Sequence, residues 1–295
     1  MSKFVIITDT SCDLNKKFRK ENNIDYVKMM FSWTDKEGEL HEIAADLDWE
    51  TISAREFYDI IRSGIRIFTS QVTMQQYLEM VEPHFEKGED VLYLACSSGL
   101  SASLKTAEML YDTELKEKYP DRRLVVVDTL RAGMAQGLIV MRAVELQKEG
   151  KSIDEIKAVI EAERLQYKEI GIPETLSYLK RAGRVSAGAA FFGNMVKLKP
   201  ILMFDDKGMN VAKEKAIGRK KAYARMAEII RDDIVDPENQ EIYLMNADCE
   251  PEDVEAFKNI ILARVNVKNI IVEPLGPVIG ASSGPGTIIV NYKGK

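Results

Sequence analysis

Short apolar runs alternate with segments of helical periodicity through the first half of the chain. The run at residues 3–8 (KFVIIT) is uninterrupted and β-branched, as in a buried parallel strand. Comparable runs occupy residues 90–96 and 122–129. Further strands are predicted at residues 26–33 and 65–73, and helices at residues 49–64, 74–88 and 131–150. This alternation predicts a three-layer α/β/α arrangement around a mostly parallel sheet.

The pattern changes after a charged helix predicted at residues 152–166, because strand signals outnumber helix signals from there on. These strands are predicted at residues 167–173, 200–206, 211–218, 241–247, 267–274 and 286–292. The turn sequence DDKGMN, at residues 205–210, predicts a hairpin between two of them. A chain of 295 residues is long for one hydrophobic core. We therefore expect an α/β fold with two domains, residues 1–162 and residues 163–295, the second with a mixed sheet.

Composition narrows the class of protein. Hydrophobic residues make up 45% of the chain and charged residues 30%, as in a soluble globular protein. The net charge of -6 argues against nucleic acid as the main partner, although basic clusters at residues 181–184 and 219–221 leave a local anion site open. The three cysteines are far apart and there are two histidines, so we expect no metal site. Sparse thiols, no leader pattern and no apolar window of about 18 residues predict a cytoplasmic location.

Polar turns follow several of the predicted strands. They lie at residues 8–13, 68–73, 96–101 and 127–129, and each precedes a helix. Because ligands of open α/β sheets bind beyond the carboxyl ends of the strands, we expect these turns to cluster and to cradle an anion. Two glycine-rich segments of the second half, residues 181–188 and 276–286, would face them. The competing interpretation is that the polar residues are helix caps, and for Asp9 a cap is favoured over a metal ligand.

The adjacent hydroxyls of Ser97 and Ser98 could act as nucleophiles or as ligand-binding groups. A serine nucleophile needs a base and a group that orients that base, and the chain has no G-x-S-x-G motif. His41 and His84 fall outside the polar turns, which also contain no lysine. These observations favour binding. The alternatives are a hydrolase or phosphotransferase that uses Ser98, and a regulatory module that binds another carboxylate or a phosphate.

Six segments in sequence order resemble the DegV family. They are TDTSCDL (8–14), TSQ (69–71), SSGLSAS (97–103), VVDT (126–129), TLSYLKRAGRVS (175–186) and GPVIGASSGPGTI (276–288). The resemblance implies a two-domain α/β protein that binds one long-chain fatty acid, such as palmitate, stearate or oleate, in the interdomain cleft, with no other cofactor. It also implies a non-enzyme, in some members the lipid-carrying subunit of a bacterial fatty acid kinase. The implied partners are a kinase catalytic subunit and, during lipid exchange, a membrane surface.

The same resemblance assigns roles to single residues. Thr69 and Ser98 would hold the carboxylate, and Ser70 and Ser97 would lie close to them. Arg184 matches an arginine near the head group. Two neutral hydroxyls that donate to a carboxylate make charge-assisted hydrogen bonds of about 1.5–3 kcal/mol each.

Further assignments concern the acyl chain and the kinase. The apolar run at residues 189–204 is suited to line the acyl slot, and the competing interpretation for most of its residues is ordinary core packing. Arg219 matches a basic residue linked to kinase function. The chain departs from the family at Val72, where the motif carries proline, and at Ser282, where it carries histidine. A hydroxyl at Ser282 can hydrogen-bond a carboxylate but cannot carry positive charge near neutral pH. We therefore expect the serine at position 282 to preserve lipid binding, whereas it puts a role with a fatty acid kinase in question.

Overall fold

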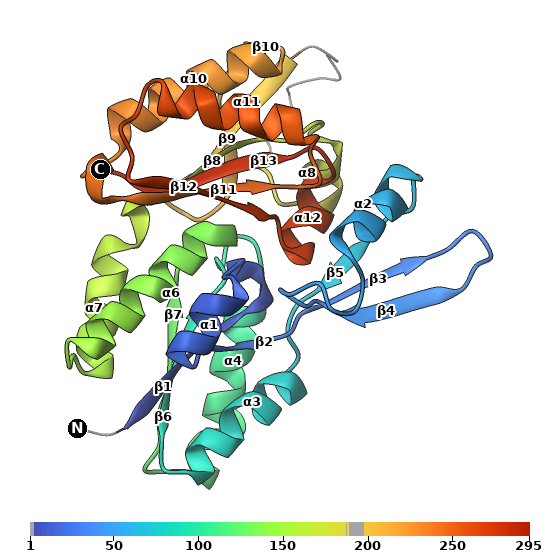
Figure 1. The fold of residues 1–295 in the computed structure, drawn as a ribbon. Helices are drawn as coiled ribbons and strands as arrows, with labels where there is room; N and C mark the ends of the chain where they lie inside the picture. The colour runs from blue at the N-terminus through green and yellow to red at the C-terminus, as the bar shows by residue number, and fades with distance from the viewer. Residues whose placement is uncertain (1–2, 187, 189–197) are drawn as a thin grey trace.

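The computed structural model describes residues 3–186, 188 and 198–295. The first half forms a parallel sheet of order β2-β1-β6-β7. Its strands are β1 (Phe4–Asp9), β2 (Asp25–Val27), β6 (Asp90–Ala95) and β7 (Leu124–Asp128). Helices α6 (Gly133–Lys148) and α7 (Ile153–Glu163) pack on one face, and α3 (Met74–Glu86) and α4 (Ser103–Leu110) on the other. The predicted α/β/α layers are confirmed, and they form the lower half of Figure 1.

Short helical segments complete this half. They are η1 (Thr10–Cys12), α1 (Lys16–Asn22), α2 (Ala54–Arg62), the π-helical turn η2 (Tyr111–Leu115), α5 (Lys116–Lys118) and η3 (Arg164–Gln166). Every residue of β6 is buried, which explains its uninterrupted apolar sequence.

The second half forms a mixed sheet of order β10-β9-β8-β13-β11-β12. Its strands are β8 (Tyr167–Ile172), β9 (Leu198–Phe204), β10 (Asn210–Ile217), β11 (Glu241–Asn246), β12 (Asn269–Pro274) and β13 (Ile288–Lys293). The predicted hairpin is the antiparallel pair β9–β10. Its helical segments are α8 (Ser177–Ala182), α10 (Arg219–Asp233), η4 (Pro237–Asn239), α11 (Pro251–Leu262) and α12 (Pro277–Ser283).

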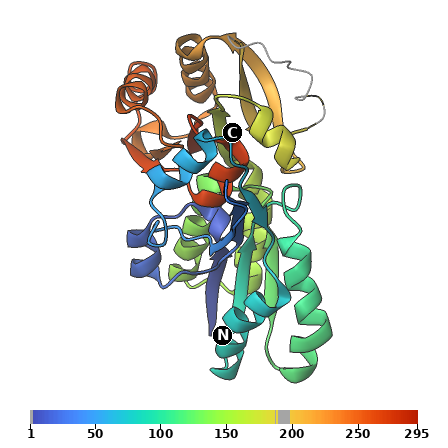
Figure 2. The same ribbon diagram turned by 90° about the vertical axis from the view of Figure 1, so that its right-hand side faces the viewer.

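The two faces of the mixed sheet have different neighbours. Ile170 and Ile172 of β8 point to the face covered by α10 and α11, where they join a core cluster with residues of those helices. The opposite face turns toward the first half, and α6 packs against β8 and β13 there. Figures 1 and 2 show the two sheets stacked along the molecule in this way.

A third, three-stranded sheet of order β4-β3-β5 was not predicted. It contains β3 (Met30–Thr34), β4 (Leu40–Ala44) and β5 (Phe68–Ser70), and the β3–β4 hairpin projects from the molecule (Figure 1). The prediction of a single strand over residues 26–33 is therefore wrong. The chain leaves the parallel sheet after Val27, where the Thr10 hydroxyl lies 3.2 Å from the Val27 carbonyl oxygen and accepts a hydrogen bond from the Met29 N–H at 3.1 Å.

The passage from the parallel to the mixed sheet lies between the end of α7 at Glu163 and the start of β8 at Tyr167. The halves are in close contact, because Tyr243, Met245 and Ile289 of the mixed sheet belong to the same core cluster as the parallel sheet. The domain limits proposed from the sequence stay a prediction.

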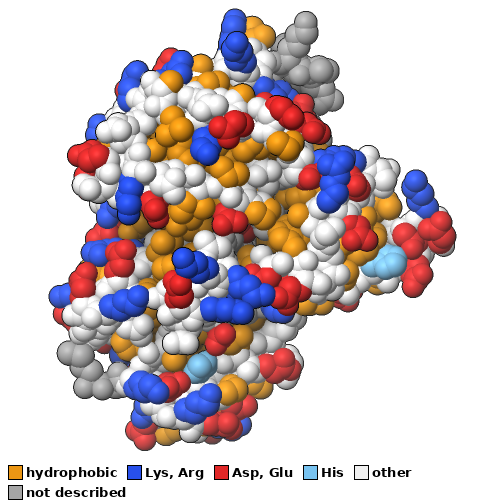
Figure 3. All heavy atoms as spheres, viewed as in Figure 1, with side chains coloured by type: hydrophobic (Ala, Val, Ile, Leu, Met, Phe, Trp, Pro, Cys, Tyr) orange, Lys and Arg blue, Asp and Glu red, His pale blue; other side chains and the backbone are white. Residues whose placement is uncertain are grey.

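On the face in Figure 3, charged side chains of both signs are mixed, and hydrophobic side chains gather between the halves. No helix among the described residues is both long enough and apolar enough to cross a lipid bilayer.

Candidate functional site

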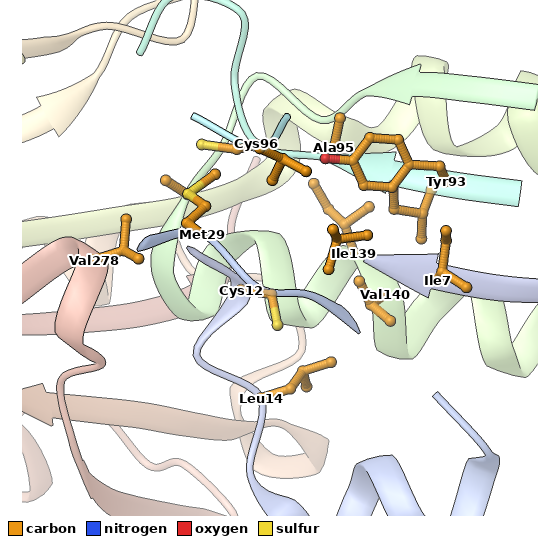
Figure 4. Packing of buried hydrophobic residues seen from close by; sticks show 14 of the residues in the cluster. Ile7, Cys12, Leu14, Met29, Tyr93, Ala95, Cys96, Ile139, Val140 and Val278 are labelled. Atoms are coloured by element: carbon orange, nitrogen blue, oxygen red, sulfur yellow. The ribbon is translucent and has the colours of Figure 1, made fainter. Parts of the chain in front are cut away.

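A cavity of about 830 Å³, partly open to solvent, lies between the two large sheets. We call it the main cavity. Polar turns of the first half form one wall, and the inner face of the mixed sheet with α12 forms the other. The lining includes Ser11, Met29, Thr69, Ser70, Gln71, Cys96, Leu100, Ser101, Ala132, Glu169, Gly171, Ile172, Leu179, Arg184, Leu202, Phe204, Asn210, Val278, Ile279, Ser282, Ser283, Thr287 and Ile289. Figure 4 shows three lining residues beside the core of the parallel sheet, Met29 and Cys96 from the first half and Val278 from α12.

Asp9 organises the turn after β1. Its buried carboxylate accepts hydrogen bonds from the Tyr93 hydroxyl (2.7 Å) and the Cys96 N–H (2.9 Å), and it caps η1 through the Ser11 N–H (3.0 Å). Gln136 of α6 donates to it at 3.3 Å. Asp9 therefore caps η1, as the sequence favoured, and it also links the polar turn after β1 to the polar turn after β6.

Ser103 connects the polar turn at residues 68–73 to the polar turn at residues 96–101. The Val72 N–H donates to the Ser103 hydroxyl at 3.1 Å, and the Ser101 and Ser103 hydroxyl oxygens are 2.9 Å apart. When Ser103 donates to Ser101, the Ser101 proton is free to bind a ligand in the main cavity. Thr69, on β5, also lines the cavity, and no described residue hydrogen-bonds its hydroxyl.

The serine pair of the sequence motif has another placement. Ser97 is fully buried and its hydroxyl donates to the Gly208 carbonyl at 2.8 Å, which ties the turn to the tip of the β9–β10 hairpin. Ser98 is exposed, and its N–H donates to the Asp128 carboxylate at 3.2 Å. Ser98 does not line the main cavity. The structure thus brings Ser101 to the ligand space, a residue that sequence reasoning missed within the same motif.

A second cavity of about 700 Å³ adjoins the first, and both are lined by Thr69, Arg184 and Ser282. Arg66 and Arg181 also line it. The half-buried Arg184 donates from Nε to the Leu100 carbonyl at 3.0 Å. This junction is the most basic part of the main cavity wall, so it is the end suited to an anionic head group.

Ser282, in α12, donates to the Val278 carbonyl at 3.3 Å while it lines both cavities. Ser70, Thr69, Arg184 and Ser282 of the predicted set are therefore brought together, and Ser97 and Ser98 lie apart from them.

Glu169 places an acidic group in the same cavity. Burial, and to a smaller extent the neighbouring Asp13, raises the pKa of Glu169 from 4.5 to about 8, whereas Arg131 opposes this rise. Burial likewise raises the pKa of Asp13 from 3.8 to about 8. Nothing in the sequence motifs marked this pair.

Other residues considered from the sequence lie elsewhere. Arg219 forms ion pairs with Glu174 (2.8 Å) and Asp253 (2.9 Å) outside the main cavity. His84 lies 2.9 Å from Glu89. His41, with Asp35 and Glu39, forms a group of possible metal ligands within 4.8 Å in the β3–β4 hairpin region, and none of the three lines either cavity.

The predicted acyl slot falls partly outside the described residues. Residues 189–197 of the run 189–204 are not among them, whereas Leu202 and Phe204 of β9 line the main cavity.

Comparison with known proteins gives full-length similarity. The family model described as "Uncharacterised protein, DegV family" matches residues 3–293. A DegV domain-containing protein of Clostridium perfringens is 36% identical over 294 residues, which cover 100% of this chain and 98% of the relative. The structure of a DegV family protein from Thermus thermophilus, described by its fatty acid binding, has a TM-score of 0.85 and 28% identity, and covers 99% of this chain and 100% of its own. A DegV lipid-binding protein from Thermotoga maritima has a TM-score of 0.81 and 26% identity, with 99% and 98% covered.

Proposed function

Because the chain belongs to the DegV family, we propose that it binds one long-chain fatty acid in the main cavity and is not itself an enzyme. The observation that carries this proposal is the cavity between the sheets, which is partly open to solvent and is lined by apolar side chains together with hydroxyls and Arg184. Its wall combines aliphatic and aromatic side chains with the hydroxyls of several serines and threonines. Related structures described as fatty acid binding or lipid binding support the choice of ligand.

The carboxylate is proposed to lie at the junction of the two cavities. There Thr69 and Ser101 donate hydrogen bonds to it, Ser282 and Ser70 lie beside them, and Arg184 supplies positive charge. Each charge-assisted bond contributes about 1.5–3 kcal/mol. Burial of the acyl chain against residues such as Leu202 and Phe204 contributes about 0.8 kcal/mol per methylene, so the chain dominates the affinity and the hydroxyls fix its direction.

Two experiments test the proposal. Solvent extraction of the purified protein, followed by mass spectrometry, is expected to release a stoichiometric acid such as palmitic, stearic or oleic acid. A polar ligand in its place, or no ligand together with no fatty acid binding by the delipidated protein, would overturn the proposal.

Substitutions then locate the head group. Thr69→Ala combined with Ser101→Ala is expected to weaken fatty acid binding by about one to three decades. Ser98→Ala is the matched control, because the same motif supplies this exposed hydroxyl outside both cavities. If Ser98→Ala weakens binding and Ser101→Ala does not, the anchor predicted from the motif is the correct one.

The alternative of a hydrolase or phosphotransferase that uses Ser98 has its own test. None of the described side chains hydrogen-bonds the Ser98 hydroxyl, and neither histidine lines the cavities. Stoichiometric labelling of Ser98 by a serine-directed phosphonate would support the enzyme and contradict our proposal.

We also propose that the bound acid is exchanged at a membrane surface and either transported or presented to a fatty acid kinase catalytic subunit. Presentation to a kinase would require the residue at position 282 to stabilise the charge that develops during phosphoryl transfer. The Ser282 hydroxyl does this less well than an imidazolium would. Transport makes no such demand.

A further inference from the structure

Buried polar groups without partners gather between the first half and the mixed sheet. The Asp13 carboxylate, after η1, is buried with no side-chain partner and has only the Gly276 backbone beside it, and both amide atoms of Asn291 on β13 are buried without a hydrogen-bond partner. Asn291 is directly opposite Glu169 in the register of β13 and β8. A methyl group in place of a Gly133 hydrogen would lie 3.1 Å from the Glu169 Oε2 atom and 3.7 Å from the Asp13 Oδ2 atom. The two carboxyl groups therefore face the same small space.

Glu169 is the member of this group that reaches the main cavity. No described residue hydrogen-bonds its carboxyl. Arg131 is the cation that acts on it, but its guanidinium already donates to the carbonyl oxygens of Tyr167 (2.5 Å), Leu130 (2.7 Å) and Leu165 (3.1 Å).

Three other polar residues of the cavity wall, outside the proposed head-group site, are satisfied within the protein. The Ser283 hydroxyl donates to the Ile279 carbonyl at 2.9 Å, and the Thr287 hydroxyl donates to the Ser283 carbonyl at 3.0 Å. The Asn210 amide donates to the Arg184 carbonyl at 3.0 Å. Glu169 thus differs from them, because it presents an unused polar group to a space that a hydrocarbon chain would fill.

A plain acyl chain has no atom that can hydrogen-bond Glu169. Glu169 is half-buried at the cavity wall, and the raised pKa favours its neutral form at pH 7, in which the carboxyl has one O–H donor and one carbonyl acceptor. A buried polar group left without a partner is costly, and an oxygen on the ligand removes that cost.

We propose that Glu169 forms a polar subsite in the main cavity, and that the preferred ligand is a long-chain acid with a hydroxyl or keto oxygen along its chain. This inference rests on the proposed function. The hydroxyl or keto oxygen accepts a hydrogen bond from the Glu169 O–H, and a hydroxyl can also donate to the Glu169 carbonyl oxygen. Asp13 and Asn291 enclose the same region from the loop after η1 and from β13.

The test measures binding of stearic acid and of a series of hydroxystearic acids, which differ in hydroxyl position, to delipidated protein at pH 7. At least one isomer is expected to bind about tenfold more tightly than stearic acid. Glu169→Leu should abolish this preference and bind stearic acid at least as well as the wild type does. Glu169→Gln keeps a donor and an acceptor, and should retain the preference.

Ser101→Ala serves as the control, because it should weaken every acid by the same factor and leave the preference unchanged. If stearic acid binds and no isomer is preferred, or if Glu169→Leu keeps the preference, the subsite inference is wrong while the proposed function stands. If no acid binds at all, both fail.

Discussion

Glu169 gives the structure a measurable pH dependence of stability. Its pKa rises from 4.5 to about 8 on folding, because the carboxyl is buried and Asp13 lies near it, while Arg131 offsets part of this rise. The unfolded chain therefore releases this proton near pH 4.5, whereas the folded protein holds it until about pH 8. Between these values the folded state binds more protons, so the free energy of unfolding falls as pH rises and levels off above about pH 8.

The size of the effect follows from the pKa values. Each group loses at most about 1.4 kcal/mol of stability per pH unit inside this window. From pH 6 to pH 8, Glu169 alone is expected to remove on the order of 2 kcal/mol, and Asp13, which titrates together with it, adds to this loss, a large share of the 5–15 kcal/mol typical of a folded protein. Glu169→Gln should remove about half of this loss, since Asp13 still titrates.

Urea unfolding at pH 6, 7 and 8 measures these free energies. Glu238→Gln is the matched control, because it neutralises an exposed glutamate and should leave the wild-type profile unchanged. Parallel profiles for the wild type and Glu169→Gln would refute the reasoning. They would mean that Glu169 ionises in the folded protein at the pH at which it ionises in the unfolded chain.

Three further outcomes follow from contacts at the site. Asp9→Asn replaces a buried acceptor of several hydrogen bonds by a group that is half donor, and urea unfolding should show a loss of about 2–4 kcal/mol. Gly208→Ala would push a methyl group into the Ser97 hydroxyl oxygen, at a residue whose φ is 73°. It should lower the unfolding free energy by at least about 2 kcal/mol more than the control Gly38→Ala, because φ is also positive at Gly38 but the space around it is empty. Ser282→His should keep fatty acid affinity within about tenfold and raise acyl-phosphate formation when a fatty acid kinase catalytic subunit and ATP are added; equal formation with the wild type would show that Ser282 does not limit kinase work.

The clustering of the polar turns could be predicted because carboxyl ends of parallel strands share one edge of a sheet. The turn at residues 68–73 reaches the same place by another route. It follows β5 of the small sheet, which pairs with β3 rather than with the parallel strands. Pairing between distant segments of this kind leaves no local signal in the sequence, so the sheet that carries Thr69 could not be predicted, although Thr69 lines the main cavity.

The choice among the serines of SSGLSAS shows a second limit. A motif fixes which residue types are present, but the direction of each side chain depends on the turn conformation and on what packs against it. The β9–β10 hairpin takes up the Ser97 hydroxyl, and the turn leaves Ser98 in solvent and Ser101 at the cavity. For Glu169 a signal was available: a glutamate directly before the apolar residues 170–172 of a predicted strand, which alternation assigns to the same face as Gly171.

Val72 stands where the motif resemblance leads us to expect a proline. A proline at this position would fix the backbone φ of the turn and would have no N–H. Val72 has an N–H, and this group donates to the buried Ser103 hydroxyl at 3.1 Å, so a hydrogen bond replaces the conformational restraint of the ring. The bond joins the turn that follows β5 to the turn that follows β6, and Ser103 in turn contacts the Ser101 hydroxyl at 2.9 Å. The substitution therefore links the proposed anchors, Thr69 and Ser101, through main-chain and hydroxyl contacts, which keeps the spacing of the two hydroxyls fixed although they come from different sheets.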